Sequence, residues 1–505
     1  MPELAFYISA LIALLLAVLL KLYPRISYTR YPPGPPKRLL FGNLREIPDK
    51  KPWIAYTKWA KEYGDVMHLQ VMNNHIIILS SMRAANDLFE KRSRIYSGRP
   101  DEDLMAFLGW SFNVGLQNYS EKWRQNRKVY QQTFRPDAIL QFIPAIQECL
   151  GSFLRDLHKS PEDFMGHIDA FIASISLKTM YGIDISGIDD PLIVVAKRAV
   201  HIFDILLSSS FVTVLKFCPF VMSVPYWVPI IGPARRNVEL SRRYANDLRN
   251  SPIEHIQRSM QGVDSDGLIP RFMREIDPHD HKSTELFQRL KDMASIFYLA
   301  GSDTSASTAG TFFLAMARNP RSQLLAQQEI DSVIGRDRLP TLDDRKDLPY
   351  VDAIYRETMR YRPAIPLGAP HTTTEADTYC GFYIPKGATV IGNVWAMTHD
   401  EEVYPDPFDF KPERFLDTKG NINDILGYGF GRRVCVGRHM ADAFLWLMFA
   451  SVLACFNIRK ERDEQGNEIE IPEDYSDGPG LFSYPLPFRC VITPRHEGAA
   501  DLIQR

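Results

Sequence analysis

The hydrophobic pattern of the first 23 residues differs from that of the rest of the chain. Residues 5–20 carry no charged side chain and are nearly all apolar. Continued through residue 23, this run would form a helix of roughly 28 Å, close to the thickness of a bilayer core. No basic segment precedes the run and no small-residue cleavage site follows it. The pattern therefore favours an uncleaved transmembrane helix over a secretory signal.

The charges that flank this run predict its orientation. Glu3 is the one charged side chain before it, whereas five basic side chains follow it: Lys21, Arg25, Arg30, Lys37 and Arg38. Positive charge collects on the cytoplasmic side of membrane anchors, so we expect the body of the protein to lie in the cytosol.

A proline-rich segment separates the anchor from the body. Residues 31–36 read YPPGPP, and because prolines fix φ and remove amide donors, this segment predicts a stiff, extended spacer. We therefore divide the chain into an anchor (1–23), a basic and proline-rich hinge (24–49) and a single body (50–505).

Helical periodicity dominates the body. Extended patterns are confined to two places, residues 65–81 and 378–393. The first predicts two strands joined by a turn at Asn73 and Asn74, and the second predicts another hairpin-like pair. The fold class expected is mainly α with a small β-sheet region.

The segment 203–233 is again very apolar, but four prolines interrupt it and would break a membrane-spanning helix. Two interpretations stay open. The segment forms either a buried helix and loop or a hydrophobic lid that dips into the membrane surface.

Composition excludes some classes of function. The 505 residues are 45% hydrophobic and carry a net charge of -2 without a long basic tract, which argues against a nucleic-acid partner. The six cysteines lie far apart, without the spacings of a zinc site or a disulfide framework, and this favours a reducing compartment. We expect all of them except Cys435 to be small buried hydrophobic residues.

Cys435 lies in the glycine-rich segment 427–437, GYGFGRRVCVG. Glycines let backbone amides approach the sulfur and Arg433 adds positive charge, so the segment can stabilise a thiolate. A cysteine that acts as a nucleophile, a redox sensor or a metal ligand must form a thiolate. An axial thiolate ligand to haem iron fits best, because it requires a tight turn and cations for the haem carboxylates. A nucleophile would need a neighbouring base, for which His439 is the candidate.

The motif Gly429-x-Gly431-x-Arg433-x-Cys435-x-Gly437, followed by Ala441, resembles the haem-binding loop of the cytochrome P-450 family. Tyr428 departs from it, since the family usually has Phe at this position. Further motifs occur in the order expected of that family. They are Trp123 and Arg127 in WRQNRK, Asp303 and Thr304 in AGSDTS, Glu357 and Arg360 in ETMR, and Arg414 in FKPERF.

The resemblance implies a cytochrome P-450 fold, an α-helical prism, in which the body is a haem-thiolate catalytic domain. It implies that Cys435 is the axial ligand of haem b, with Gly431 and Gly437 in its loop. The haem carboxylates would be bound by Trp123, Arg127, Arg433 and His371.

Other roles follow from the same resemblance. Glu357, Arg360 and Arg414 would form a buried structural network. Thr304 and Asp303 would assist dioxygen activation and proton delivery, from a helical run over about residues 284–318. Because Gly, Ser, Asp and Thr are poor interior helix residues, we expect the helix to open locally there. The substrate pocket would be lined by Phe107, Trp110, Phe112, Phe297, Ala300, Ile365, Leu367, Leu481 and Phe482.

The amino-acid sequence of the C-terminal half is similar to that of fungal members of the O-methylsterigmatocystin oxidoreductase-like group. The implied reaction is monooxygenation of a lipophilic substrate, such as a terpenoid in secondary metabolism, with dioxygen and electrons from NADPH. A separate NADPH-cytochrome reductase in the endoplasmic reticulum membrane would supply the electrons. Its docking surface would include Arg124, Lys128, Arg432 and Arg438, which could equally be a solvated face.

Two alternatives stay open. One is a haem-thiolate isomerase or dehydratase that acts without a reductase, and the other is a membrane-tethered haem carrier or sensor. The Asp303-Thr304 pair favours the monooxygenase, because rearrangement chemistry does not require proton delivery to oxygen.

Overall fold

The computed structural model describes most of the body of the chain. The described residues are 30–38, 41–185, 187, 189–208, 222–225, 227–229, 231–259, 266–277, 279–417, 421–476 and 481–504. The expected anchor, residues 1–23, lies outside them. Among the described residues, one helix is long and apolar enough to cross a membrane, and it is the core helix Arg438–Cys455, 78% buried.

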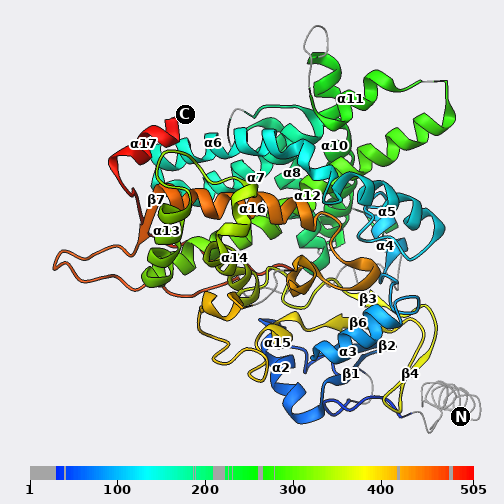
Figure 1. The fold of residues 1–505 in the computed structure, drawn as a ribbon. Coiled ribbons are helices and arrows are strands. Elements are labelled where there is room, and N and C mark those ends of the chain that lie inside the picture. Colours follow the sequence, from blue (N-terminus) through cyan, green and yellow to red (C-terminus); the bar gives the residue numbers. More distant parts are fainter. Residues whose placement is uncertain are drawn as a thin grey trace, which may run out of the picture.

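The body is mainly helical, with a small sheet region at the end where the described chain begins (Figure 1). Four helices lie around the cavity that contains Cys435: α5 (Glu121–Phe134), α12 (His281–Arg318), α14 (Pro349–Tyr361) and α16 (Arg438–Cys455). The remaining helices are α2 (Pro52–Tyr63), α3 (Met82–Ala85), α4 (Glu102–Phe107), α6 (Ile143–Lys159), α7 (Phe164–Tyr181), α8 (Pro191–Ser208), α10 (Ile231–Ser259), α11 (Leu268–Glu275), α13 (Pro320–Val333), α15 (Val394–Thr398) and α17 (Glu497–Gln504).

Helix α12 is the longest of these and passes through the helical part of the molecule. The carboxylate of Asp280 accepts hydrogen bonds from the amides of Lys282 and Ser283 at its start. The helix ends before Asn319, as predicted, because Pro320 begins α13. The expected local opening was wrong. α12 is one continuous helix, and the hydroxyls of Ser and Thr in the polar segment bond back to carbonyls four residues earlier.

The main sheet has the strand order β1-β2-β6-β3. β1 (Val66–Val71) and β2 (Asn74–Leu79) form the predicted hairpin, but Val71 pairs with Asn74. The turn is therefore Met72–Asn73, one residue earlier than expected. β6 (Thr389–Gly392) lies parallel to β2, and β3 (His371–Thr372) pairs with β6.

The second predicted hairpin is only partly correct. β4 (Asp377–Tyr379) and β5 (Phe382–Ile384) form a hairpin whose turn contains Cys380 and Gly381, both at positive φ. The following strand β6 joins the other sheet. A third pair, β7 (Phe456–Arg459) and β8 (Val491–Pro494), was not expected.

The proline-rich segment lies against β1. The amide of His68 donates to the carbonyl of Pro33, at 2.9 Å. A Cβ atom added at Gly34 would lie 2.3 Å from the carbonyl oxygen of His68, so this close approach requires glycine. The segment is not helical, as predicted, and it packs on the sheet.

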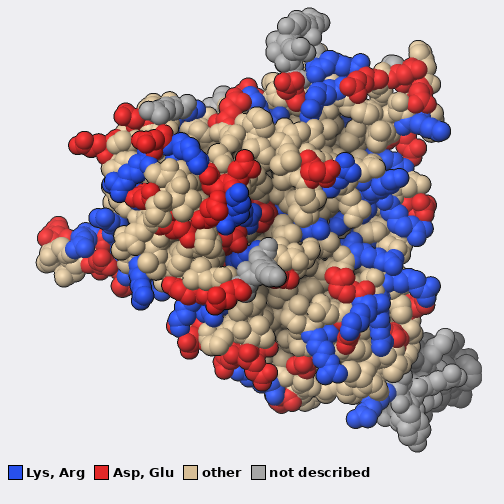
Figure 2. All heavy atoms as spheres, viewed as in Figure 1, with Lys and Arg blue, Asp and Glu red and all other residues tan. Residues whose placement is uncertain are grey.

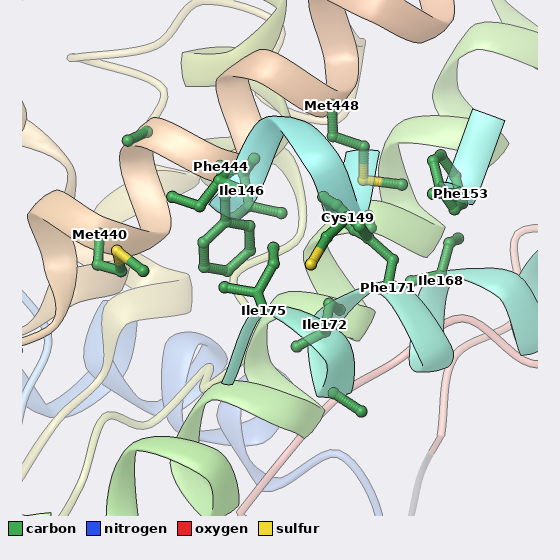
Figure 3. Close-up of a cluster of buried hydrophobic side chains, with 14 of the residues drawn as sticks. Ile146, Cys149, Phe153, Ile168, Phe171, Ile172, Ile175, Met440, Phe444 and Met448 are labelled. Carbon is green, nitrogen blue, oxygen red and sulfur yellow. The ribbon is translucent and has the colours of Figure 1, made fainter. Parts of the chain in front are cut away.

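One part of the main core lies between α6, α7 and α16, where aliphatic, aromatic and sulfur-containing side chains interdigitate (Figure 3). Cys149 and Cys455 are buried, as predicted for small hydrophobic residues. Cys380 is exposed at the hairpin turn, so the prediction of burial was wrong there. Cys218 lies outside the described residues.

The apolar segment 203–233 is described only in part. Leu206, near the end of α8, is buried, whereas Trp227 is 81% exposed. Residues 209–221 lie outside the described residues, so the choice between a buried loop and a membrane lid stays a prediction.

Candidate active site

One cavity of about 340 Å³ collects half of the catalytic, cofactor-binding and pocket residues that the sequence singled out. Its walls come from α5, α12, the segment 364–371 and the loop before α16. Nine of the predicted site residues line it: Arg127, Phe297, Ala300, Thr304, Ile365, His371, Arg433, Cys435 and Gly437.

The loop that carries Cys435 is built around tight turns. The amide of Cys435 donates to the carbonyl of Tyr428 at 2.7 Å, which closes the loop. Gly429 and Gly431 have φ angles of +80° and +56°. A Cβ atom at Gly431 would lie 2.0 Å from the carbonyl oxygen of Phe89, so no side chain fits there. Gly431 thus packs the loop against the chain and does not itself line the cavity.

The thiol of Cys435 opens into the cavity just before the N-terminus of α16. Burial holds the pKa of the Cys435 thiol above its usual value, and the amides of Gly437 and Arg438 and the guanidinium groups of Arg127 and Arg438 act in the opposite direction. The positive end of the α16 dipole also favours an anion at this position. The local groups are therefore arranged to stabilise a thiolate.

His439, the base that a cysteine nucleophile would need, lies on α16 outside the cavity lining. Burial and the neighbouring Arg438 lower the pKa of His439. The structure thus places the thiol in the cavity without the proposed base, which disfavours the nucleophile interpretation.

Three buried arginines, Arg99, Arg127 and Arg433, line the same cavity. Arg433 donates to the carbonyls of Ser97 and Gln117, and Arg99 donates to that of Gly115. Among the described residues, no carboxylate lies within ion-pair distance of any of the three.

Three such cations in one place are electrostatically costly. Burial and then the charges of Arg99 and Arg127 lower the pKa of Arg433 to about 8. Burial lowers the pKa of Arg99 and of Arg127 to about 10. Nε of Arg127 is buried without a hydrogen-bond acceptor. A ligand that carries carboxylates would relieve the repulsion, so these residues fit a haem.

His371 lies on β3, buried against the ring of Phe89 at 4.3 Å. Nδ1 of His371 donates to the carbonyl of Tyr96 at 2.6 Å. Burial and the charges of Arg99 and Arg433 hold the pKa of His371 well below its usual value, so the imidazole is neutral. The structure places it beside the arginines, as the sequence predicted.

Trp123 lies behind the arginines. It is buried on α5, and its ring centre is 4.3 Å from the guanidinium carbon of Arg433 and 6.0 Å from that of Arg127. Trp123 therefore supports the cations and does not line the cavity. Tyr130 and Phe134 continue the same face of α5 and do line it.

In the polar segment of α12, Thr304 faces the cavity. Its hydroxyl donates to the carbonyl of Ala300 at 2.9 Å. Asp303 is half-buried on the same turn, outside the cavity lining. The structure thus brings Thr304, and not Asp303, to the surface of the cavity.

The predicted Glu357 network is present. Glu357 is completely buried and accepts two hydrogen bonds from Arg360, at 2.6 and 2.8 Å. Nε of Arg414 and the amide of Lys411 also donate to Glu357, at 3.2 and 2.8 Å. The network ties α14 to the segment that leads to the Cys435 loop.

The expected substrate pocket needs correction. Six of its predicted residues do not line the cavity: Phe107, Trp110, Phe112, Leu367, Leu481 and Phe482. Trp110 is fully buried and donates from Nε1 to Ser241. Phe107 lies 4.3 Å from the guanidinium carbon of Arg242.

The other four residues also pack elsewhere. Phe112 stacks on Trp110, and Leu367 packs against the β1–β2 side of the sheet. Leu481 and Phe482 are half-buried outside the lining. Asn113, Val114 and Ile296 line the cavity instead, and no sequence motif points to them.

The basic residues predicted for partner docking lie at the surface or near it. Arg124, Lys128 and Arg432 are exposed, and Arg438 is half-buried. Arg124 forms an ion pair with Glu121, so part of its charge is compensated. Lys and Arg side chains gather on the side of the molecule where α4 and α5 lie (Figure 2).

A family model described as cytochrome P-450 matches residues 32–483. This chain belongs to the cytochrome P-450 family. A cytochrome P-450 monooxygenase of Rhodocybe pseudopiperita is 36% identical over 484 residues, covering 94% of this chain and 91% of the relative. One from Postia placenta is 35% identical over 481 residues, covering 94% and 92%. One from Coprinopsis cinerea is 36% identical over 488 residues, covering 94% and 91%.

The protein is thus a haem-thiolate monooxygenase that uses haem iron, dioxygen, a substrate and a redox partner. The names of these three relatives do not include O-methylsterigmatocystin oxidoreductase, so that subgroup stays a prediction.

Proposed function

We propose that this cytochrome P-450 hydroxylates, or otherwise oxidises, a small lipophilic metabolite in a fungal secondary pathway such as terpenoid biosynthesis. Cys435 would bind the haem iron through its sulfur. Arg99, Arg127, Arg433 and His371 would bind the haem carboxylates. When bound, haem iron with a thiolate ligand activates dioxygen so that one oxygen atom enters the substrate.

The single observation that carries the proposed site is the position of Cys435. Its thiol opens into the same cavity as three buried arginines that have no carboxylate partner among the described residues. A thiolate ligand and cations for carboxylates in one cavity are what a haem requires.

The proposed substrate class follows from the apolar part of the cavity lining. Ile296, Phe297, Ala300 and Ile365 are apolar, and they contribute no charge to it. Such a lining favours a lipophilic molecule, because an apolar wall cannot compensate a buried charge. Thr304, on the same helix, would hold and pass a proton at its hydroxyl oxygen.

The proposed partner is an NADPH-cytochrome reductase, which would deliver electrons singly. The proposed location is the endoplasmic reticulum membrane, with residues 1–23 as a single-pass anchor and the catalytic domain in the cytosol. The support is the apolar run and the five basic residues that follow it.

A difference spectrum tests the proposed ligand. Membranes that contain the full chain are reduced and exposed to carbon monoxide, and Cys435→Ala is compared with the wild type. We expect a strongly red-shifted Soret band that the variant lacks. A band in the variant like that of the wild type would exclude Cys435 as the ligand.

Reconstitution tests the electron source. Substrate oxidation should require NADPH, a reductase and dioxygen together. Product formation without the reductase would contradict the proposed partner. The isomerase and carrier alternatives are not retained, because the matched relatives are named monooxygenases.

A further inference from the structure

Tyr428, seven residues before Cys435, is attached to α14. Its hydroxyl oxygen lies 2.7 Å from that of Tyr355, a fully buried residue of α14. Its carbonyl accepts the hydrogen bond from the amide of Cys435. The first half of the Cys435 loop is therefore fixed to α14 through one pair of phenol groups.

Asp442, seven residues after Cys435, is attached to the same region. Arg345 donates two hydrogen bonds to the Asp442 carboxylate, at 2.5 and 3.1 Å. Arg345 also donates to Asp352 in the first turn of α14, at 2.6 and 2.8 Å. The second half of the loop and the start of α16 are thus fixed to α14 through an ion pair.

The two attachments meet. The guanidinium carbon of Arg345 lies 5.3 Å from the ring centre of Tyr355. Trp446, which is fully buried on α16, lies on Arg345 as well, at 5.5 Å. The cation, the two phenols and the carboxylate form one packed cluster that holds both flanks of Cys435.

The phenol pair is a permanent connection at ordinary pH. Burial raises the pKa of Tyr355 and that of Tyr428 well above their usual value, so both hydroxyls keep their protons. Removal of one hydroxyl leaves the other buried without its partner, which costs more than one ordinary hydrogen bond.

We propose that Tyr428 and Tyr355 are positioning residues which, with the Arg345–Asp442 ion pair, clamp the Cys435 loop to α14 and keep its sulfur on the haem iron. The proposal rests on the proposed role of Cys435. Release of the loop at either flank removes one of the contacts that hold the sulfur on the iron, whereas Gly431, Arg433 and the rest of the fold keep their own contacts.

The test follows the red-shifted carbon monoxide band of the full-length haem protein over time in a fixed, mild concentration of guanidinium chloride. The variants are Tyr428→Phe, Tyr355→Phe and the double variant. Tyr350→Phe is the matched control. The hydroxyl of Tyr350 also extends from α14, but it donates to the carboxylate of Glu413, at 2.8 Å. Circular dichroism recorded in parallel reports the helical content.

We expect each single variant to lose the band about tenfold faster than the wild type while the helical content is unchanged. The double variant should lose it no faster than the faster single variant, because both changes break one connection. Tyr350→Phe should stay within about twofold of the wild type. Asp442→Asn, which weakens the other attachment, should also accelerate the loss.

Wild-type decay rates in both single variants would overturn the clamp, as would equal acceleration in Tyr350→Phe. Multiplicative effects in the double variant would overturn it too, since the two hydroxyls would then act through separate contacts. If Cys435→Ala keeps the red-shifted band, both the proposed role of Cys435 and the clamp are excluded. If Cys435→Ala loses the band and the tyrosine variants behave like the wild type, only the clamp is excluded.

Discussion

The guanidinium carbon of Arg433 lies 4.3 Å from the ring centre of Trp123, and its nitrogens donate to backbone carbonyls. This arrangement fixes the side chain of Arg433 from behind and from its sides. The cation is therefore held in the cavity beside Arg99 and Arg127 before any anion arrives, and the protein bears the repulsion among the three charges.

Replacement of Arg433 should have opposite effects on the two forms of the protein. In Arg433→Met the buried charge is gone, so the haem-free protein should gain about 1–3 kcal/mol in unfolding free energy. The haem protein should release haem at least about tenfold faster, because a carboxylate loses its partner. Thermal unfolding without haem and haem transfer to apomyoglobin measure the two effects. A less stable haem-free variant would contradict the argument.

Gly431 should tolerate no side chain. Gly431→Ala places a Cβ atom 2.0 Å from the carbonyl oxygen of Phe89, at a φ of +56°. We expect the variant to lose haem incorporation. Gly429→Ala is the control, since no atom lies within 4 Å of its Cβ and only backbone strain of about 1–3 kcal/mol opposes it. Haem content per protein, measured by absorbance, should be lower in Gly431→Ala than in Gly429→Ala.

Local spacing explains which site residues could be predicted. Trp123 with Arg127, and Glu357 with Arg360, lie one helical turn apart, so a sequence motif carries their geometry. Arg99 comes from a distant segment and no spacing relates it to Cys435. Its role depends on the folded chain, and nothing in its sequence neighbourhood could have identified it.

The wrong predictions have physical causes as well. Trp110 is as apolar as a pocket residue, yet it packs in the core and bonds to Ser241. The type of a residue alone does not distinguish a pocket residue from a core residue. The sequence identified β6 as a strand, but its pairing with β2 is a long-range choice. The predicted opening of α12 is absent, because the hydroxyls of Ser302 and Thr304 donate hydrogen bonds to carbonyls of their own helix.

Loss of the Glu357 carboxylate should unfold the region around α14. Glu357→Ala leaves the buried guanidinium of Arg360 and its neighbour Arg414 without a counter-charge, which costs roughly 3–5 kcal/mol. Glu375→Ala is the control, because its ion pair with Arg94 is exposed and its removal costs less than about 1 kcal/mol. Guanidinium chloride unfolding compares them. Equal midpoints for the two variants would contradict a structural role for the network.

His399 should make the protein sensitive to acid. Burial and then the charges of Arg360 and Arg362 lower the pKa of His399 to about 3. The unfolded chain takes up a proton near pH 6.5, whereas the folded chain resists it. Stability is therefore fully present above pH 6.5 and is lost as the pH falls from 6.5 towards 3. The slope of the melting temperature between pH 6.5 and 5 should be smaller in His399→Gln, and an unchanged slope would exclude His399 as a source.

Thr304 should couple electron use to product formation. Its hydroxyl faces the cavity from α12, and Thr304→Ala removes the group proposed to hold a proton there. We expect product formed per NADPH consumed to fall at least about tenfold, since proton delivery typically contributes 10²–10⁴-fold. The measurement compares NADPH oxidation with product in the reconstituted system.

Thr308→Ala is the matched control for this experiment. Thr308 also lines the cavity and donates to a carbonyl four residues earlier, that of Thr304, at 2.9 Å. Its loss removes a similar hydroxyl one turn further along α12. If both variants uncouple equally, the effect comes from the polarity of the helix face in general. If only Thr304→Ala uncouples, the position of that hydroxyl is what the reaction requires.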